Sequence, residues 1–179
     1  MAEEVLLKSD RILSIYPSVC ERYYDHKYFT NGSNDQTVLF HSNRVCVITL
    51  SANHCIIKDK KTIENIDFNI NSDLNRLDNK VSGKWKKGGQ RVTPESILCR
   101  IECKDNEVFD IKACINGTIV EMNTKLAQNH DLVKQKTWSD GFIAIILPFR
   151  GKQESEKNSL LSPEEYKSLK QTEDQIINT

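Results

Sequence analysis

Nothing in this sequence of 179 residues has the pattern of a segment that enters or crosses a membrane. The N-terminal residues include Glu3 and Glu4, whereas a secretory signal peptide begins with a basic segment. The longest apolar run extends from Phe142 to Pro148, which is the length of a β-strand and far short of a membrane span. We therefore expect a soluble chain that stays in the cytosol or nucleus.

The chain also has no excess of either charge. It contains 25 Lys and Arg residues and 25 Asp and Glu residues, so its formal net charge is zero. A dedicated nucleic-acid-binding domain is usually basic overall, so this balance argues against one while leaving room for a local basic patch. With 38% hydrophobic residues, the composition is that of a globular chain long enough for one domain with tails.

Short motifs that mark common active sites are absent from the sequence. It contains no Gly-x-Ser-x-Gly nucleophile elbow, no phosphate-binding loop, no His-Glu-x-x-His zinc site and no dinucleotide-binding fingerprint. The histidines lie in or beside predicted turns and loops; they are His26, His41, His54 and His130. We predict that the protein is not an enzyme and needs no cofactor.

No pair of cysteines has the Cys-x-x-Cys spacing that is typical of structural zinc sites and redox motifs. Strand pairing could bring together Cys99, Cys103 and Cys114. Two of them, Cys99 and Cys103, share one face of a predicted strand with Ile97 and Ile101, so burial in the core is the better interpretation. We expect free, mostly buried thiols and no metal site.

The hydrophobic pattern indicates a mostly β fold. Residues 37–40 and 44–50 are rich in β-branched and apolar side chains and flank a turn at 41–43, which predicts a hairpin. Alternation with period two predicts strands at 66–70 and 96–103, and a tight turn at Asp105-Asn106 leads the second into a return strand at 108–111. Further strands are expected at 115–120 and, centrally in a sheet because it is apolar throughout, at 141–147.

Two places carry the signature of a helix start. Ser18 with Glu21, and Ser162 with Glu165, each match a capping box, in which the serine and the acidic side chain satisfy backbone N–H groups. One or two short helices are expected within 123–135. We divide the chain into an N-terminal extension at 1–17, a β domain at 18–150, and a polar tail at 151–179 with a capped helix near 162–171.

Two glycine-containing segments occur in a distinctive order. The first is a turn bounded by Gly83 and Gly88 before the strand at 97–103, and the second is the strand 117–123 before the closing segment at 140–145. Together, over about 81–147, they resemble the lipoyl/biotinyl carrier fold, and in particular the glycine-cleavage H-protein. The resemblance implies a barrel-sandwich with short helices and a C-terminal helix.

A longer and more specific string reads His41-Ser42-Asn43-Arg44-Val45-Cys46-Val47-Ile48-Thr49-Leu50. Together with residues 18–24 and 79–84, it is similar to the Abitram (Simiate) family, over about 18–148. This resemblance implies a protein that binds monomeric or filamentous actin and has a transcription-linked role. It also implies a location in the nucleus, including nuclear speckles, in the cytoplasm and in cell projections.

Lys104 is the one candidate for lipoyl attachment, because the carrier family presents a modified lysine on a hairpin. The expected turn at Asp105-Asn106 puts this lysine beside the tip, so a solvated charge next to a turn is the favoured interpretation. A lipoyl-type carrier subunit is the alternative function.

A segment without any acid contains Lys80, Lys84, Lys86, Lys87 and Arg91, with Trp85 among them. It could contact an anionic partner, either actin or the phosphates of a nucleic acid. Charge runs are more often solvated, with Trp85 then packed in the core. A nucleic-acid-associated protein that uses 80–91 is a further alternative.

Arg44 lies in the turn of the family-like string and is a second candidate for binding a partner's carboxylate. The alternative is an arginine that forms an ion pair on the protein's own surface, beside a turn held by Ser42 and Asn43.

Overall fold

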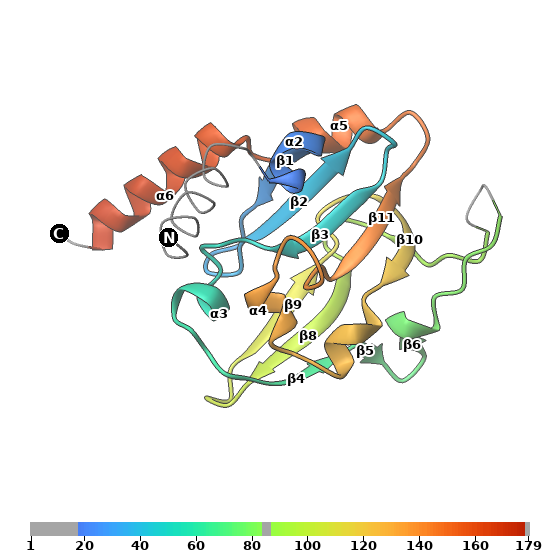
Figure 1. The fold of residues 1–179 in the computed structure, drawn as a ribbon, viewed down its shortest axis with the longest axis horizontal. Helices are drawn as coiled ribbons and strands as arrows, with labels where there is room; N and C mark the ends of the chain where they lie inside the picture. Colours follow the sequence, from blue (N-terminus) through green and yellow to red (C-terminus); the bar gives the residue numbers. More distant parts are fainter. Residues whose placement is uncertain (1–17, 84–86, 178–179) are drawn as a thin grey trace, which may run out of the picture.

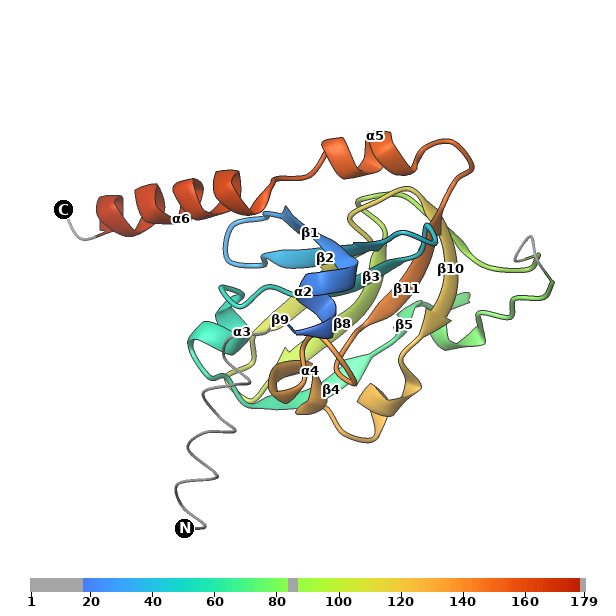
Figure 2. The ribbon, with the colours of Figure 1, turned by 45° about the horizontal axis from the view of Figure 1, so that its top comes forward.

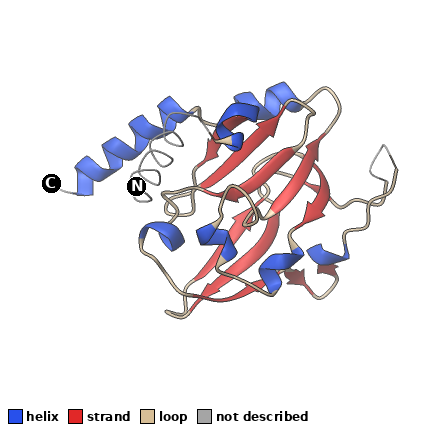
Figure 3. Ribbon diagram, viewed as in Figure 1, coloured by secondary structure: helices blue, strands red, loops and turns tan. Residues whose placement is uncertain are grey.

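The computed structural model describes residues 18–83 and 87–177 of the chain. Antiparallel pairing of the strands produces a six-stranded sheet, a three-stranded sheet and a short two-stranded ribbon (Figure 1). The helices lie around the strands, and all but the last are short (Figure 3). The expectation of a mostly β protein is confirmed.

The strand order in the six-stranded sheet is β1-β2-β3-β11-β10-β7. Its strands are β1 (Tyr24–Phe29), β2 (Gln36–His41), β3 (Cys46–Leu50), β7 (Arg91–Val92), β10 (Gly117–Met122) and β11 (Ala144–Pro148). The smaller sheet has the order β4-β8-β9 and contains β4 (Ile63–Asp67), β8 (Ile97–Cys103) and β9 (Val108–Lys112). The ribbon pairs β5 (Asn69–Asn71) with β6 (Leu74–Asn75).

The α-helices are α2 (Val19–Tyr23), α3 (Cys55–Lys58), α4 (Leu132–Gln135), α5 (Gln153–Asn158) and α6 (Pro163–Ile177). Two 3₁₀ turns are η1 (Arg76–Asp78) and η2 (Thr124–Ala127). None of the helices in the described part of the chain combines the length and the apolar character that crossing a membrane requires.

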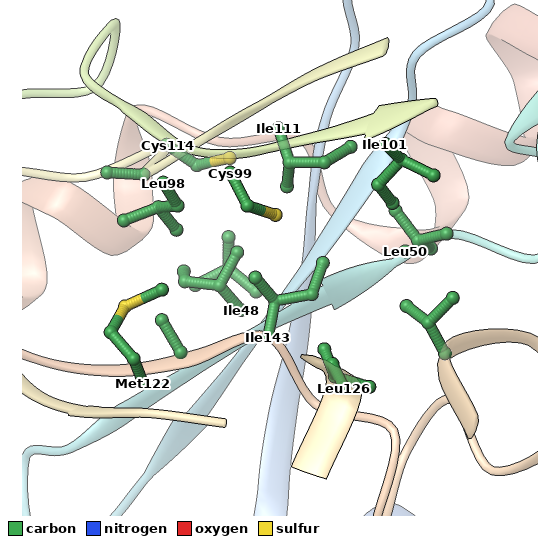
Figure 4. Close-up of a cluster of buried hydrophobic side chains, with 14 of the residues drawn as sticks. Ile48, Leu50, Leu98, Cys99, Ile101, Ile111, Cys114, Met122, Leu126 and Ile143 are labelled. Atoms are coloured by element: carbon green, nitrogen blue, oxygen red, sulfur yellow. The ribbon is translucent and has the colours of Figure 1, made fainter. Parts of the chain in front are cut away.

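The core lies between the two sheets, because the inward-facing side chains of both are aliphatic (Figure 4). Fully buried members include Ile48, Ile119, Ile146, Ile101, Ile111 and Leu126. Among the described strands, the sheets do not close into one barrel. The two sheets are joined where β2 meets β9. The side-chain amide of Gln36 donates to the Lys112 carbonyl (2.8 Å) and accepts from the Lys112 N–H (2.9 Å).

Most elements expected from the pattern are present. The hairpin β2–β3, the hairpin β8–β9 and the central strand β11 are present, but β3 begins at Cys46 instead of residue 44 and β11 begins at Ala144 instead of residue 141. The capping box of Ser18 and Glu21 is formed at the start of α2. All six cysteines are free and five are buried, as expected.

Two strands differ from the expectation. The predicted strand at 66–70 is divided at Phe68, because the Asp67 carboxylate accepts from the Asn69 N–H (2.8 Å) and turns the chain toward the ribbon. The predicted strand at 115–120 begins only at Gly117, since Cys114 adopts a positive φ of 64°. Both departures come from local backbone geometry that the alternation pattern does not register.

The polar tail is docked on the six-stranded sheet (Figure 2). Glu156 of α5 is buried and accepts from the backbone N–H (2.9 Å) and side-chain amide (3.0 Å) of Asn116. Leu161 pairs with Tyr28 through two backbone hydrogen bonds of 3.0 Å, so it covers the free edge of β1. The box of Ser162 and Glu165 starts α6 as predicted, and the helix continues to Ile177 rather than ending near 171.

Candidate functional site

Residues 80–83 and 87–89 project from the six-stranded sheet beside β10 and are called the arm below (Figure 1, right). Ser82 and Lys87 close it with two backbone hydrogen bonds of 3.0 Å. Gly88 has φ +83°, and a Cβ there would lie 2.6 Å from the Lys80 carbonyl oxygen. The two backbone segments of the arm therefore lie so close together that only glycine fits at this position. Lys84, Trp85 and Lys86 lie outside the described residues.

Polar side chains anchor the base of the arm. Asn79 accepts from the Gln90 N–H (2.7 Å) and donates to the Ile119 carbonyl of β10 (3.0 Å). The buried Arg76 guanidinium donates to the Gln90 side chain (2.8 Å) and to the Ile97 carbonyl (2.9 Å). Burial lowers the pKa of Arg76. These bonds fix the ends of the arm to both sheets.

Sheet register brings Arg44 to the same end of the molecule as the arm. Arg91 of β7 pairs with Thr118 of β10, β10 pairs with β11, and β11 pairs with β3, which Arg44 precedes. Neighbouring strands lie about 4.8 Å apart, so β7 and β3, which are separated by three such spacings, lie about 14 Å apart. Arg44 has φ 78° and donates its N–H to the His41 carbonyl (3.0 Å) in the tight β2–β3 turn.

We call Lys80, Lys87, Arg91 and Arg44 the cationic end. All four side chains are exposed, and within 18–83 and 87–177 none of them forms an ion pair. The Arg91 guanidinium lies over the partly exposed ring of Phe149, 6.0 Å from its centroid. The sequence shows the four cations but not that Arg44 lies at the same end of the sheet as Arg91, which depends on strand order.

Lys104 lies far from the cationic end, at the tip of the β8–β9 hairpin (Figure 1, lower left). The tip is a loop of Lys104, Asp105 and Asn106, closed by a bond from the Cys103 N–H to the Glu107 carbonyl (2.9 Å), with Asn106 at φ 61°. The expected two-residue turn at Asp105-Asn106 is therefore wrong, because Asn106 takes the left-handed position after a turn that includes Lys104.

Lys61 holds this hairpin tip to the start of β4. Its ammonium contacts Asp105 (2.7 Å) and Glu107 (2.9 Å), and the hydrogen bonds to these carboxylates raise the pKa of Lys61. The hydrogen bond from Lys61 lowers the pKa of Asp105. Sequence reasoning missed Lys61, because its partners lie on a hairpin that is distant along the chain.

A buried carboxylate, also missed, holds the tail helix. Asp35 is fully buried, accepts from the Tyr166 hydroxyl (2.8 Å) and pairs with the Lys170 ammonium (2.7 Å). Ser51 also bonds the Tyr166 hydroxyl (2.9 Å). Burial, with a smaller contribution from Asp35, raises the pKa of Tyr166 to about 12. The group fixes α6 rather than forming an open site.

The buried thiols have no features of a nucleophile. Cys99 and Cys114 lie in the core (Figure 4), and burial raises the pKa of both, which disfavours the reactive thiolate. In the described part of the chain, no group of three His, Cys, Asp or Glu side chains is placed to hold a metal ion.

Comparison with known proteins identifies the family and the fold of the chain. Residues 69–173 match the family described as Glycine cleavage H-protein. Protein Abitram of Danio rerio is 41% identical over 157 residues, covering 86% of this chain and 89% of the relative. The Abitram proteins of Xenopus tropicalis (39% over 158 residues; 86% of each chain) and Homo sapiens (34% over 159 residues; 87% and 88%) are also similar. The chain belongs to the Abitram family.

The fold of this Abitram family member is also that of an H-protein. A crystal structure of a glycine cleavage system H protein from Mycobacterium marinum superposes with a TM-score of 0.56 at 14% identity, covering 82% of this chain and 96% of that one. The predicted carrier-type fold is therefore confirmed. The family match ends inside α6, so it includes most of the docked tail as well as the β domain.

Proposed function

We propose that this member of the Abitram family is a non-enzymatic actin-binding protein, and that its cationic end contacts an anionic surface of actin. The observation that carries the proposal is that Arg44 and Arg91 lie at one end of the six-stranded sheet, with Lys80 and Lys87 in the adjoining arm. All four are exposed, and none has an ion-pair partner among the described residues. Such cations attract an anionic protein surface and orient its approach. Actin is the partner that the resemblance to the Abitram family implies.

The proposal includes a role linked to transcription, with the protein in nucleus and cytoplasm and in cell projections. Microscopy of a fluorescent fusion at native expression level tests this part. A fusion confined to a single compartment would contradict it.

Co-sedimentation with filamentous actin tests the partner and the surface. We expect the wild-type chain to pellet with filaments and the Arg44→Glu, Arg91→Glu variant to bind with about tenfold or weaker affinity, because both charges face the partner. Raising the salt concentration should weaken wild-type binding, since exposed charges are screened.

The matched control is Lys60→Glu, Lys104→Glu, which makes the same change in net charge near the hairpin tip. Equal losses in both variants would show a general charge effect and reject the cationic end as the contact. No binding of the wild type to filaments or to monomers would reject actin as the partner. Strongly salt-dependent binding to RNA or DNA instead would favour the nucleic-acid alternative.

A lipoyl-type carrier is the second candidate, because Lys104 occupies an exposed hairpin loop in a domain of H-protein type. Attachment of a lipoyl group requires an exposed lysine amine, and this loop can accommodate such a group. Intact mass spectrometry of the protein from its native cell should show an adduct that Lys104→Arg abolishes. An unmodified native chain would exclude this candidate.

A further inference from the structure

Among the described residues, the face of the six-stranded sheet that points away from the core is covered in one half only. In the covered half, Leu39 of β2 is 1% exposed, and its neighbour His26 packs edge-on against Trp138 with ring centroids 4.9 Å apart. Tyr28 in the same half stacks on Tyr166 of α6, at 4.1 Å. Thr49 of β3 is also buried in this half, whereas Val47 of β3 and the outward-facing side chains of β11 and β10 are partly or fully exposed.

Register identifies the members of the exposed half. Val47 is opposite Ile145, and Leu147 is opposite Thr118, so their side chains share one face. The residues between them, including Ile48 and Ile146, are fully buried and face the core. Along the same face lie five partly exposed aliphatic side chains, which we call the outer patch: Val45, Val47, Val120, Ile145 and Leu147.

Charged residues border the outer patch unevenly. Arg91 is opposite Thr118 and stacks over Phe149, while Arg44 directly precedes Val45. Glu121, opposite Ile145, is exposed. None of these three side chains has an ion-pair partner among the residues with described positions. An apolar centre with a charged rim is the usual anatomy of a protein interface.

The arm adds to this border. A Cβ on Gly89 would lie 2.6 Å from the Thr118 side chain, so the base of the arm rests against the strand that carries Val120. Lys80 and Lys87 are therefore on the same side of the patch as Arg91. Two copies face to face would bring these cations together, whereas an anionic protein surface is complementary to them.

We propose that the outer patch is the apolar centre of the actin contact, with Arg44 and Arg91 as its cationic rim. This inference rests on the proposed function. The complementary surface of actin would present aliphatic or aromatic side chains flanked by carboxylates. Desolvated apolar contacts at the centre of an interface supply most of its affinity, and rim charges mainly set orientation and association rate.

The test replaces apolar centre residues with threonine, which keeps a β-branched side chain suited to strands. The variant Val47→Thr, Ile145→Thr, Leu147→Thr should bind filamentous actin about tenfold or more weakly than wild type. The control variant Val108→Thr, Ile70→Thr, Leu74→Thr makes the same three changes on β9, β5 and β6 and should bind like wild type. Urea denaturation of both variants checks that each is folded.

Three results would overturn the inference, and they differ from one another. If wild type binds and the outer-patch variant binds equally well, the patch is not the contact, while the proposed function stands. If wild type does not bind actin at all, both proposals fail. If sedimentation velocity without actin shows a wild-type dimer that the outer-patch variant alone loses, the patch is covered by a second copy of the chain.

Discussion

His54 illustrates how one buried side chain sets a pH dependence. It is fully buried, its Nδ1 accepts from the Ile56 N–H (3.2 Å) at the start of α3, and its ring meets Phe109 edge-on. With Nδ1 as acceptor, the proton resides on Nε2, which has no hydrogen-bond partner among the described residues. Protonation would therefore bury a charge, and burial lowers the pKa of His54 to about 4.

We expect His54 to reduce the free energy of unfolding as the pH falls from 6.5 to about 4. The unfolded chain binds the proton near pH 6.5 and the folded chain only near 4, so the stability present above 6.5 is lost across this window, by about 3 kcal/mol. His54→Asn keeps a capping acceptor without a titrating ring. Urea denaturation at several pH values should show a steeper acid loss for wild type; parallel pH profiles would contradict the assignment.

For single residues, the sequence reveals functional groups whose members are neighbours along the chain. It does not reveal pairs whose members are distant along the chain and meet only in the fold. The cations of the arm are close together in sequence, so their grouping was visible. Asp35 and Tyr166 are 131 positions apart, and no local pattern in the sequence links them. Its burial depends on a helix that docks from the other end of the chain.

Among the elements, one of the contacts that hold the tail is the strand-like pairing of Leu161 with β1. Its N–H donates to the Tyr28 carbonyl and its carbonyl accepts from the Tyr28 N–H, which satisfies the edge of β1. Leu161→Pro removes the donor and should weaken docking of α6 by about 1 kcal/mol, since a lost backbone hydrogen bond costs that order. Trypsin should then cleave faster after Lys167 and Lys170 in α6.

Leu161→Ala is the matched control for that substitution, because it shortens the side chain and keeps both backbone bonds. Equal cleavage rates for the proline and alanine variants would show that the edge pairing does not hold the helix. The capping box at Ser162 and Glu165 is intact in both variants, so helix formation itself is not the variable.

Strands were predicted best where alternation alone decides them. In β8, buried Cys99, Ile101 and Cys103 alternate with partly exposed Arg100 and Glu102, as the pattern indicated. The division at Phe68 was not predicted, because an apolar side chain fits both a continuous strand and a bend that inserts it into the core. Which of these occurs depends on the Asp67 hydrogen bond and on separate partners for β4 and β5.

For the whole molecule, the contacts that residues 152–179 make with the β domain include this tail in the folded unit. Removing residues 152–179 would take Tyr166 and Lys170 from the buried Asp35, take Glu156 from Asn116 and uncover the edge of β1. Breaking a buried ion pair by removing one partner costs about 3–5 kcal/mol, because the remaining charge is uncompensated. A chain of residues 1–151 should therefore unfold at clearly lower urea and aggregate through the exposed edge.

A chain of residues 1–171 provides the comparison. It keeps Leu161, Tyr166 and Lys170 and loses surface pairs such as Lys58 with Asp174, which contributes about 1 kcal/mol or less. Its urea midpoint should stay near that of the full chain, with no increase in light scattering. If 1–151 matched 1–171 in both measurements, the docked tail would be an appendage, and the β domain alone would account for the stability of the fold.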